Sequence, residues 1–174
     1  MIRRRRQLIG DRVRVQHRIK SELRCFGFPI PGSRGPWSVR LVHWLKAVRF
    51  PDSYQQQSFK HLLAEYDYLC KLVEQQTRLL SKLTATEPYA SQVKLLKTIS
   101  GIGPISAMGL LLELGDISRF ARGRQLAAYL GLTPSQYSSG DNIRLGRITR
   151  TGKTSLRGTL TEAAWTSNKE IPGN

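Results

Sequence analysis

The segment that decides the fold runs from residue 59 to residue 83 and reads FKHLLAEYDYLCKLVEQQTRLLSKL. Its apolar residues recur at alternating steps of three and four, which is the spacing of a helix that packs along one face against another helix. This seam consists of Phe59, Leu62, Tyr66, Leu69, Val73, Gln76, Leu80 and Leu83. Gln76 is its one polar member. The spacing therefore predicts one long helix with a helical partner.

The sequence leaves two partners open for this helix. Within the chain, the segment 3–26 carries apolar residues at helical spacing and is itself predicted to be a helix, which Gly27 and the prolines after it end. Between chains, the seam of a second copy would serve equally, which predicts a homo-oligomer formed through residues 59–83. A shorter helix is predicted near residues 37–48, where several apolar residues share one face.

The chain beyond residue 88 is organised differently, because the pair Glu87-Pro88 breaks the helical pattern. Further helices are predicted near residues 89–99, 105–114, 118–130 and 155–165. Residues 143–148 are the one plausible short strand or hairpin. We therefore predict a mainly α protein in two parts. Residues 1–88 form a long helical hairpin or coiled-coil arm, and residues 89–174 form a small helical domain.

Basic side chains dominate both ends of the chain. Lys and Arg number 28 against 12 Asp and Glu, so the net charge is +16. Residues 1–60 hold 14 basic and 3 acidic side chains, residues 61–121 hold 6 of each, and residues 122–174 hold 8 and 3. Such a surplus attracts polyanions through the release of their counterions. The charge predicts nucleic acid as the partner, with two contact surfaces separated by a structural segment.

Several other kinds of site and location have no support in the sequence. Cys25 and Cys70 form no CxxC pair, and the three histidines lack the spacing of metal ligands. No apolar run approaches the roughly 20 residues of a membrane span, and no apolar stretch follows the basic start MIRRRRQLIG as it would in a secretory signal. We expect a cytoplasmic protein with reduced thiols, no metal site and no membrane segment.

The segment SGIGP, residues 100–104, joins two apolar helices. We expect Gly101 and Gly103 to be needed because the turn demands positive φ and a close approach of the backbone. Ile102 should point inward, and Pro104 suits the first turn of the next helix, whose free N–H groups can cradle a phosphate. The pattern predicts a helix-hairpin-helix that binds DNA through Gly101 and Gly103. The alternative is a tight helix connection without a ligand.

A second candidate site lies in residues 131–160, which read GLTPSQYSSGDNIRLGRITRTGKTSLRGTL. The residues predicted to bind DNA here are Arg144, Arg147, Arg150, Lys153 and Arg157. Arginine makes bidentate contacts with phosphate, and the glycines among them let a backbone approach it. A solvated basic loop is the alternative. Ser138 and Ser139 place two hydroxyl groups in this setting, where positive charge would stabilise a serine that attacks a phosphodiester.

Residues 93–165 resemble the C-terminal transposase domain of the insertion sequence 110 and 1111 families. The resemblance rests on four motifs in the family's order: GIGP at 101–104, F-x-x-x-R-Q-L-A-A-Y-L-G-L-T-P at 120–134, Y-x-S-G at 137–140 and G-x-x-x-L-R at 152–157. The helices before residue 83 are similar to the coiled-coil region that connects the domains of this family.

The resemblance implies a chemistry for one residue. In the family, the serine of Y-x-S-G is the nucleophile of DNA strand exchange, and it matches Ser139, while Ser138 stands at the variable position. The resemblance also implies that an RNA encoded by the element guides target choice. A divalent metal is bound by four acidic residues of a separate N-terminal domain, and the two sites come together from different subunits.

The chain departs from the family before residue 60, where its only acids are Asp11, Glu22 and Asp52 and none stands in a metal-site motif. Family members also usually continue with more helix after Trp165. We therefore expect a truncated copy or a fragment that holds no cofactor, binds nucleic acid and is an incomplete catalyst alone. The alternative function is a non-catalytic helix-hairpin-helix module that binds DNA or RNA. The Y-x-S-G step after GLTP favours the transposase.

Overall fold

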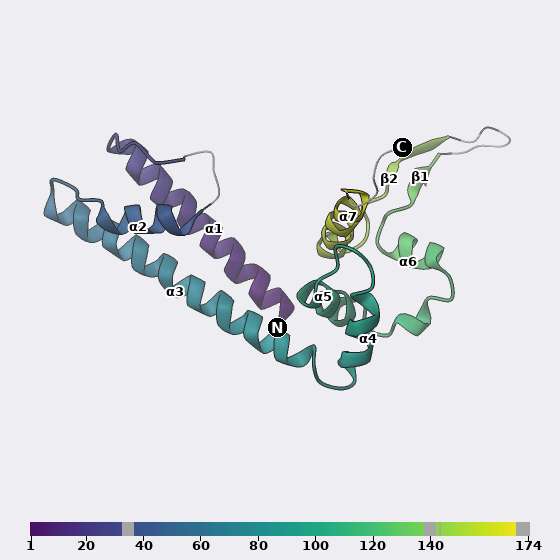
Figure 1. Cartoon of the computed structure of the whole chain (residues 1–174). Helices are drawn as coiled ribbons and strands as arrows, with labels where there is room; N and C mark the ends of the chain where they lie inside the picture. Colours follow the sequence, from purple (N-terminus) through teal and green to yellow (C-terminus); the bar gives the residue numbers. More distant parts are fainter. Residues whose placement is uncertain (33–36, 138–141, 143, 170–174) are drawn as a thin grey trace. The chain divides into compact units, whose positions relative to one another are not determined.

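The structure is a computed structural model that describes residues 1–32, 37–137, 142 and 144–169. The described residues form seven α-helices, a 3₁₀ turn and one two-stranded sheet, which confirms the prediction of a mainly α fold (Figure 1). The contacts divide the chain into two compact units, residues 1–79 and residues 80–174. This division lies close to residue 88, where the sequence predicts the end of the helical arm.

Three helices build the first unit: α1 (Ile2–Cys25), α2 (Val39–Ala47) and α3 (Ser53–Leu83), which the unit includes as far as Leu79. α2 begins after Ser38, whose Oγ accepts a hydrogen bond from the backbone N–H of Leu41 (3.2 Å). α3 begins earlier than the apolar seam because Asp52 accepts a hydrogen bond from the N–H of Gln55 (2.9 Å) and so caps the first turn.

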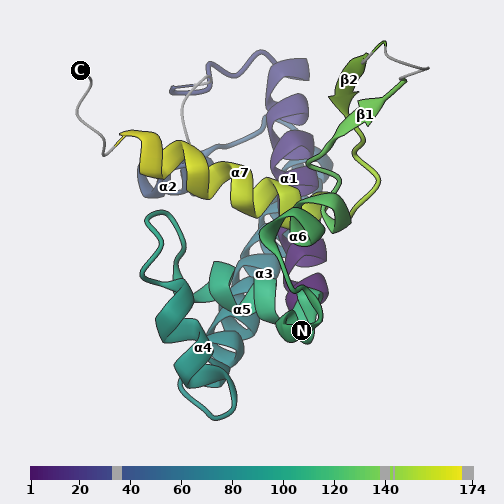
Figure 2. The same ribbon diagram turned by 90° about the vertical axis from the view of Figure 1, so that its right-hand side faces the viewer.

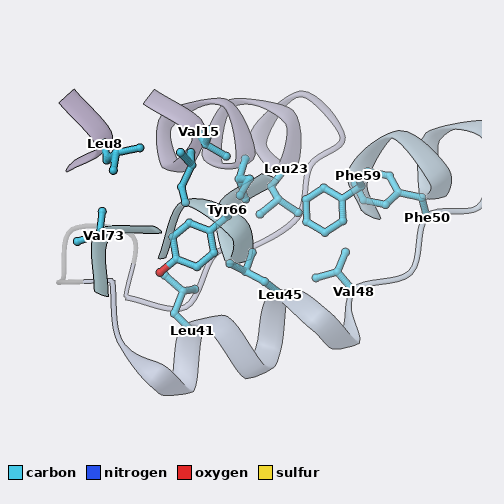
Figure 3. Packing of buried hydrophobic residues seen from close by; sticks show 12 residues of the cluster. Leu8, Val15, Leu23, Leu41, Leu45, Val48, Phe50, Phe59, Tyr66 and Val73 are labelled. Atoms are coloured by element: carbon cyan, nitrogen blue, oxygen red, sulfur yellow. The ribbon is translucent and has the colours of Figure 1, made fainter. Parts of the chain in front are cut away.

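The two long helices of this unit, α1 and α3, run antiparallel. Arg5 Nε donates to Thr77 Oγ1 at 2.8 Å near one end of the pair. Arg18 Nη1 lies 3.4 Å from a carboxylate oxygen of Glu65 further along it. Figure 3 shows the resulting core, with Tyr66 in the middle and Phe59 beside Leu23. The buried cluster consists of Leu8, Val15, Ile19, Leu23, Leu41, Leu45, Val48, Phe50, Phe59, Tyr66, Leu69 and Val73.

The seam predicted for residues 59–83 is therefore satisfied inside the chain. Phe59 and Val73 pack into a cluster that α1 and α2 complete, and Leu62 packs against its margin. The periodicity allows a partner helix either in the same chain or in a second copy, and in the structure the partner is α1 of the same chain. Burial of an apolar side chain contributes about 1.5–3 kcal/mol, so the unit loses much of its stability if this packing is opened.

Truncation of the seam tests this arrangement. We expect Leu69→Ala to lower the free energy of unfolding of residues 1–79 by about 2 kcal/mol, because Leu69 is 9% exposed and the lost methyl groups leave a cavity. The mass in sedimentation should not change, since the partner helix belongs to the same chain. A mass that halves with the substitution would show instead that residues 59–83 join two copies.

The second unit contains four α-helices: α4 (Tyr89–Leu96), α5 (Pro104–Leu114), α6 (Gly123–Tyr129) and α7 (Thr154–Lys169). α5 is apolar on most of its circumference and packs against both α4 and α7. A helix that is buried on nearly all sides forms the centre of its domain. The buried apolar residues here include Val93, Ile102, Met108, Leu111, Leu114, Leu130, Leu156 and Ala163.

The single helix predicted for residues 118–130 is wrong. The structure has a 3₁₀ turn, η1 (Ile117–Arg119), then extended backbone at Phe120 and Arg122, and only then α6. Asp116 starts the turn by accepting from the N–H of Ser118 (2.9 Å), and the ring of Phe120 packs on Tyr129 at a centroid distance of 5.3 Å. The apolar spacing reflects this ring contact across a bend rather than a continuous helix.

A small hairpin follows α6. β1 (Pro134–Gln136) pairs antiparallel with β2 (Leu145–Ile148), which confirms a strand within the segment predicted for it. Figure 2 shows the hairpin extending away from α6. All four residues of β2 are exposed. Among the described residues, no helix has both the length and the apolar character that a membrane span requires.

Candidate nucleic-acid interface

The turn between α4 and α5 holds the first predicted contact, Gly101. Its φ is +80°, in the left-handed region that favours glycine. A Cβ at this position would lie 2.7 Å from the carbonyl oxygen of Ala163 on α7. Ile102 is 5% exposed and points inward, as predicted. Gly101 is therefore needed for the turn and for the close approach of α7.

Gly103 has a different geometry from the one expected. Its φ is −82° and its ψ is 172°, so the prediction that both glycines need positive φ is wrong for this one. It is the N-cap of α5, Pro104 follows in the first turn, and no side chain caps that turn. A Cβ at Gly103 would meet no atom within 4 Å. The backbone is accessible here because nothing packs on it, which suits a helix N-terminus that receives an anion.

Three of the predicted arginines lie on or beside the hairpin. Arg144, Arg147 and Arg150 are all exposed. Side chains alternate between the two faces of a strand, so Arg147 lies on the face opposite to its neighbours Gly146 and Ile148. Arg150 has a φ of 54° and donates its backbone N–H to the carbonyl oxygen of Gly131 (3.1 Å), which ties the end of the hairpin to the end of α6. Ser139, the predicted nucleophile, lies outside the described residues.

The remaining two predicted contacts, Lys153 and Arg157, are directed into the protein. Lys153 Nζ donates to the carbonyl oxygen of Glu113 at 2.9 Å, near the end of α5. Arg157 Nη1 donates to the carbonyl oxygens of Leu130 (3.0 Å) and Gly152 (2.7 Å). Carbonyl oxygens at helix C-termini carry partial negative charge and attract cations. These two side chains hold the start of α7 against the ends of α5 and α6.

The two groups of cations predict different effects of substitution. We expect Arg147→Gln to reduce the salt dependence of DNA affinity by about 0.9 in the log–log slope. Its effect on unfolding should stay within about 0.5 kcal/mol, since the side chain is exposed. Arg157→Gln should lower the free energy of unfolding by about 2 kcal/mol, because two carbonyl groups lose a charged donor. Binding titrations and thermal unfolding of both variants check this contrast. Equal stability of the two variants would contradict it.

Sequence reasoning missed the buried carboxylate of Glu113, which is 7% exposed. Ser155 Oγ donates to its Oε2 at 2.7 Å, so this acid joins α5 to the first turn of α7. A single acid in the apolar run LLLELG is the signal that could have found it, because a charge is rarely buried without a partner.

Arg119 was also missed. Its Cζ lies 4.6 Å from the ring centroid of Phe120 and 4.7 Å from that of Tyr129, so the guanidinium lies over two aromatic rings. The contact stabilises the bend before α6. No residue spacing indicated it, because the bend itself was not predicted.

Within the part of the chain that the structure describes, no group of three or more His, Cys, Asp or Glu side chains could hold a metal ion. The candidate interface therefore consists of the open N-terminus of α5 and the exposed arginines of the hairpin. Both kinds of group bind phosphate oxygens, through backbone N–H groups and through guanidinium respectively.

A mainly helical, strongly basic chain with exposed arginines has the charge and composition that nucleic-acid-binding proteins share. Comparison with known proteins is more specific. Residues 93–172 match the model of the Transposase IS116/IS110/IS902 family, and this part of the chain belongs to that family.

Three relatives show how far the likeness extends. A putative transposase, y4qE, of Sinorhizobium fredii is 33% identical over 136 residues, which cover 78% of this chain and 31% of the relative. The transposase for insertion sequence element IS1328 of Yersinia enterocolitica is 31% identical over 157 residues, 90% of this chain and 46% of the relative. The transposase for IS1111A of Coxiella burnetii is 34% identical over 98 residues, 51% of this chain and 27% of the relative. The chain spans less than half the length of each relative.

Proposed function

We propose that this chain acts in the transposition of an insertion sequence, with residues 93–172 as the part that handles DNA and Ser139 as the nucleophile. The observation that carries the proposal is the family match over these residues, which contain the Y-x-S-G motif at 137–140. The relatives that share this region are named transposases. The exposed arginines of the hairpin flank the motif on its C-terminal side and support a site for phosphate.

The proposed chemistry is a serine strand exchange. Ser139 Oγ attacks the phosphorus of a phosphodiester, a serine–DNA phosphodiester bond forms, and the deoxyribose oxygen departs as a hydroxyl group. The serine proton passes to a base, and the departing oxygen takes up a proton. Guanidinium groups of Arg144, Arg147 and Arg150 would stabilise the negative charge that develops on the phosphoryl oxygens. Attack by a hydroxyl of another strand then reverses the step and releases Ser139.

Two partners follow from the family resemblance and belong to the same proposal. One is an RNA that guides target choice, and the other is a second subunit that brings its own site to the DNA. The described residues offer no ligand set for a metal ion. The family resemblance assigns the divalent metal to a separate acidic domain.

The test is a chimera. Residues 93–165 replace the corresponding segment of an active family member that keeps its own N-terminal domain and C-terminal residues. Incubation with that member's guide RNA and DNA substrates should give exchanged strands and a covalent protein–DNA adduct. A chimera that binds DNA with normal affinity and forms neither product would contradict the proposal and would favour the non-catalytic binding module.

A further inference from the structure

The face of α1 that points away from the core carries a row of basic side chains. Four of the five buried residues of this helix belong to the core that α1 forms with α2 and α3, namely Leu8, Val15, Ile19 and Leu23. At 100° per residue, a second set of positions lies on the opposite side of the helix. We call this set the α1 stripe, and it consists of Arg3, Gln7, Gly10, Arg14, His17, Ser21 and Arg24.

Charge is more concentrated on α1 than anywhere else in the unit. The helix holds nine Arg and Lys residues against two acids, Asp11 and Glu22. Some of the cations have partners in the protein: Arg5 bonds to Thr77, Arg14 pairs with Asp11, and Arg18 lies near Glu65. Arg3 and Arg24 are exposed, and no partner for either guanidinium is found among the residues that the structure describes.

The electrostatics around Arg5 show how crowded these charges are. Burial lowers the pKa of Arg5, and the positive charges of Arg12 and Arg6 lower it further. Repulsion of this kind is relieved when a polyanion binds. Depressions in the surface lie along the stripe, one of 560 Å³ lined by Arg4, Arg6, Gln7, Gly10, Asp11 and Arg14. Gly10 lies in the middle of the stripe, and a Cβ there would meet only the end of the Arg14 side chain at 3.8 Å, so space is open beside it.

We propose that the α1 stripe binds the sugar–phosphate backbone of double-stranded DNA lengthwise, as a second nucleic-acid surface separate from the hairpin of residues 134–148. The inference rests on the proposed function only in taking DNA as the partner. From Arg3 to Arg24 the stripe is about 32 Å long at 1.5 Å per residue, enough to follow several successive phosphates. It contains no Phe, Tyr or Trp, and the imidazole of His17 is its only ring, so it lacks the series of aromatic platforms on which the bases of a single strand stack.

The experiment compares two triple variants of the full chain that remove the same charge. The stripe variant is Arg3→Gln, Arg14→Gln and Arg24→Gln. The control is Lys60→Gln, Lys71→Gln and Arg78→Gln, three exposed cations that share one outward face of α3. Each set contains one arginine in an ion pair with an acid on its own helix, Arg14 with Asp11 and Arg78 with Glu74, which matches the two variants.

Affinity is measured by fluorescence anisotropy on a DNA duplex of about 30 base pairs between about 50 and 200 mM salt. We expect the stripe variant to lose about 2.7 from the log–log salt slope and at least about tenfold in affinity at 0.1 M salt, as three phosphate contacts are lost. The control should lose less than about twofold. Equal losses in the two variants, or none in the stripe variant, would overturn the proposal. A loss confined to a duplex RNA of the same length would also overturn it and would identify RNA as the occupant.

Two further variants separate loss of DNA binding from loss of folding, and the stripe from the hairpin. If the stripe variant loses helix content, Gln7→Glu with Ser21→Glu places acids on the stripe at exposed neutral positions and should weaken binding in the same way. Arg144→Gln, Arg147→Gln and Arg150→Gln together test the hairpin. If only the hairpin variant loses affinity, the stripe inference fails while the proposed function stands. If neither variant loses affinity, both fail.

Discussion

In the chimera that carries residues 93–165, we expect Ser139→Ala to abolish covalent protein–DNA adducts and Ser138→Ala to leave them nearly unchanged. The two serines are neighbours with the same side chain, so each is the matched control of the other. Only Ser139 stands at the serine of the Y-x-S-G motif. Loss of a hydroxyl that forms the covalent bond removes the reaction path altogether, whereas loss of a neighbouring hydroxyl removes at most one hydrogen bond.

Binding separates chemistry from structure in this comparison. DNA affinity of the Ser139→Ala chimera should stay within about 1 kcal/mol of the parent, because the contact is dominated by phosphate charge. Adducts are counted on denaturing gels with labelled DNA, and affinity is measured on the same preparations. Adducts that persist in Ser139→Ala, or that disappear only in Ser138→Ala, would show that the nucleophile is another residue.

The helices of the first unit could be predicted from the sequence, but their pairing could not. Heptad spacing predicts that one face of residues 59–83 is buried. It does not identify the helix that covers this face. The choice depends on contacts between distant residues, such as Arg5 with Thr77 and Arg18 with Glu65, which fix the antiparallel alignment with α1. Their residue types are ordinary on a helix surface, so they carry no signal before the fold is known.

The candidate site shows a second limit of sequence reasoning. Five cations between residues 144 and 157 have the composition of a phosphate site, yet Lys153 and Arg157 donate to carbonyl oxygens of Glu113, Leu130 and Gly152. A carbonyl at a helix C-terminus and a phosphate oxygen attract the same donors. Composition therefore cannot separate the cations that bond within the domain from those that stay exposed to solvent. Exposure separates them, and Arg144, Arg147 and Arg150 remain on the surface.

The two glycines of the GIGP turn also looked alike in the sequence and differ in the structure, which gives the largest stability effect that we predict. We expect Gly101→Val to lower the free energy of unfolding of the second unit by about 3–5 kcal/mol. A β-branched residue at a φ of +80° is strained, and its Cβ would lie 2.7 Å from the backbone carbonyl of Ala163, which cannot move without displacing α7.

Gly103→Val is the matched control, because the same side chain enters the same turn two residues later. Its φ of −82° suits any residue, and a Cβ there meets nothing within 4 Å. Valine is only a poorer N-cap than glycine, so the loss of unfolding free energy should stay near 1 kcal/mol. Thermal and denaturant unfolding of both variants check the difference.

Titration of Gly103→Val with DNA tests whether this turn binds phosphate. A valine at the open N-terminus of α5 should hinder the approach of a phosphate and weaken binding while the unit stays folded. If Gly103→Val binds DNA as tightly as the parent, the turn only connects two helices, and Gly101 is the one glycine that it needs. The phosphate contacts must then come from the arginines alone.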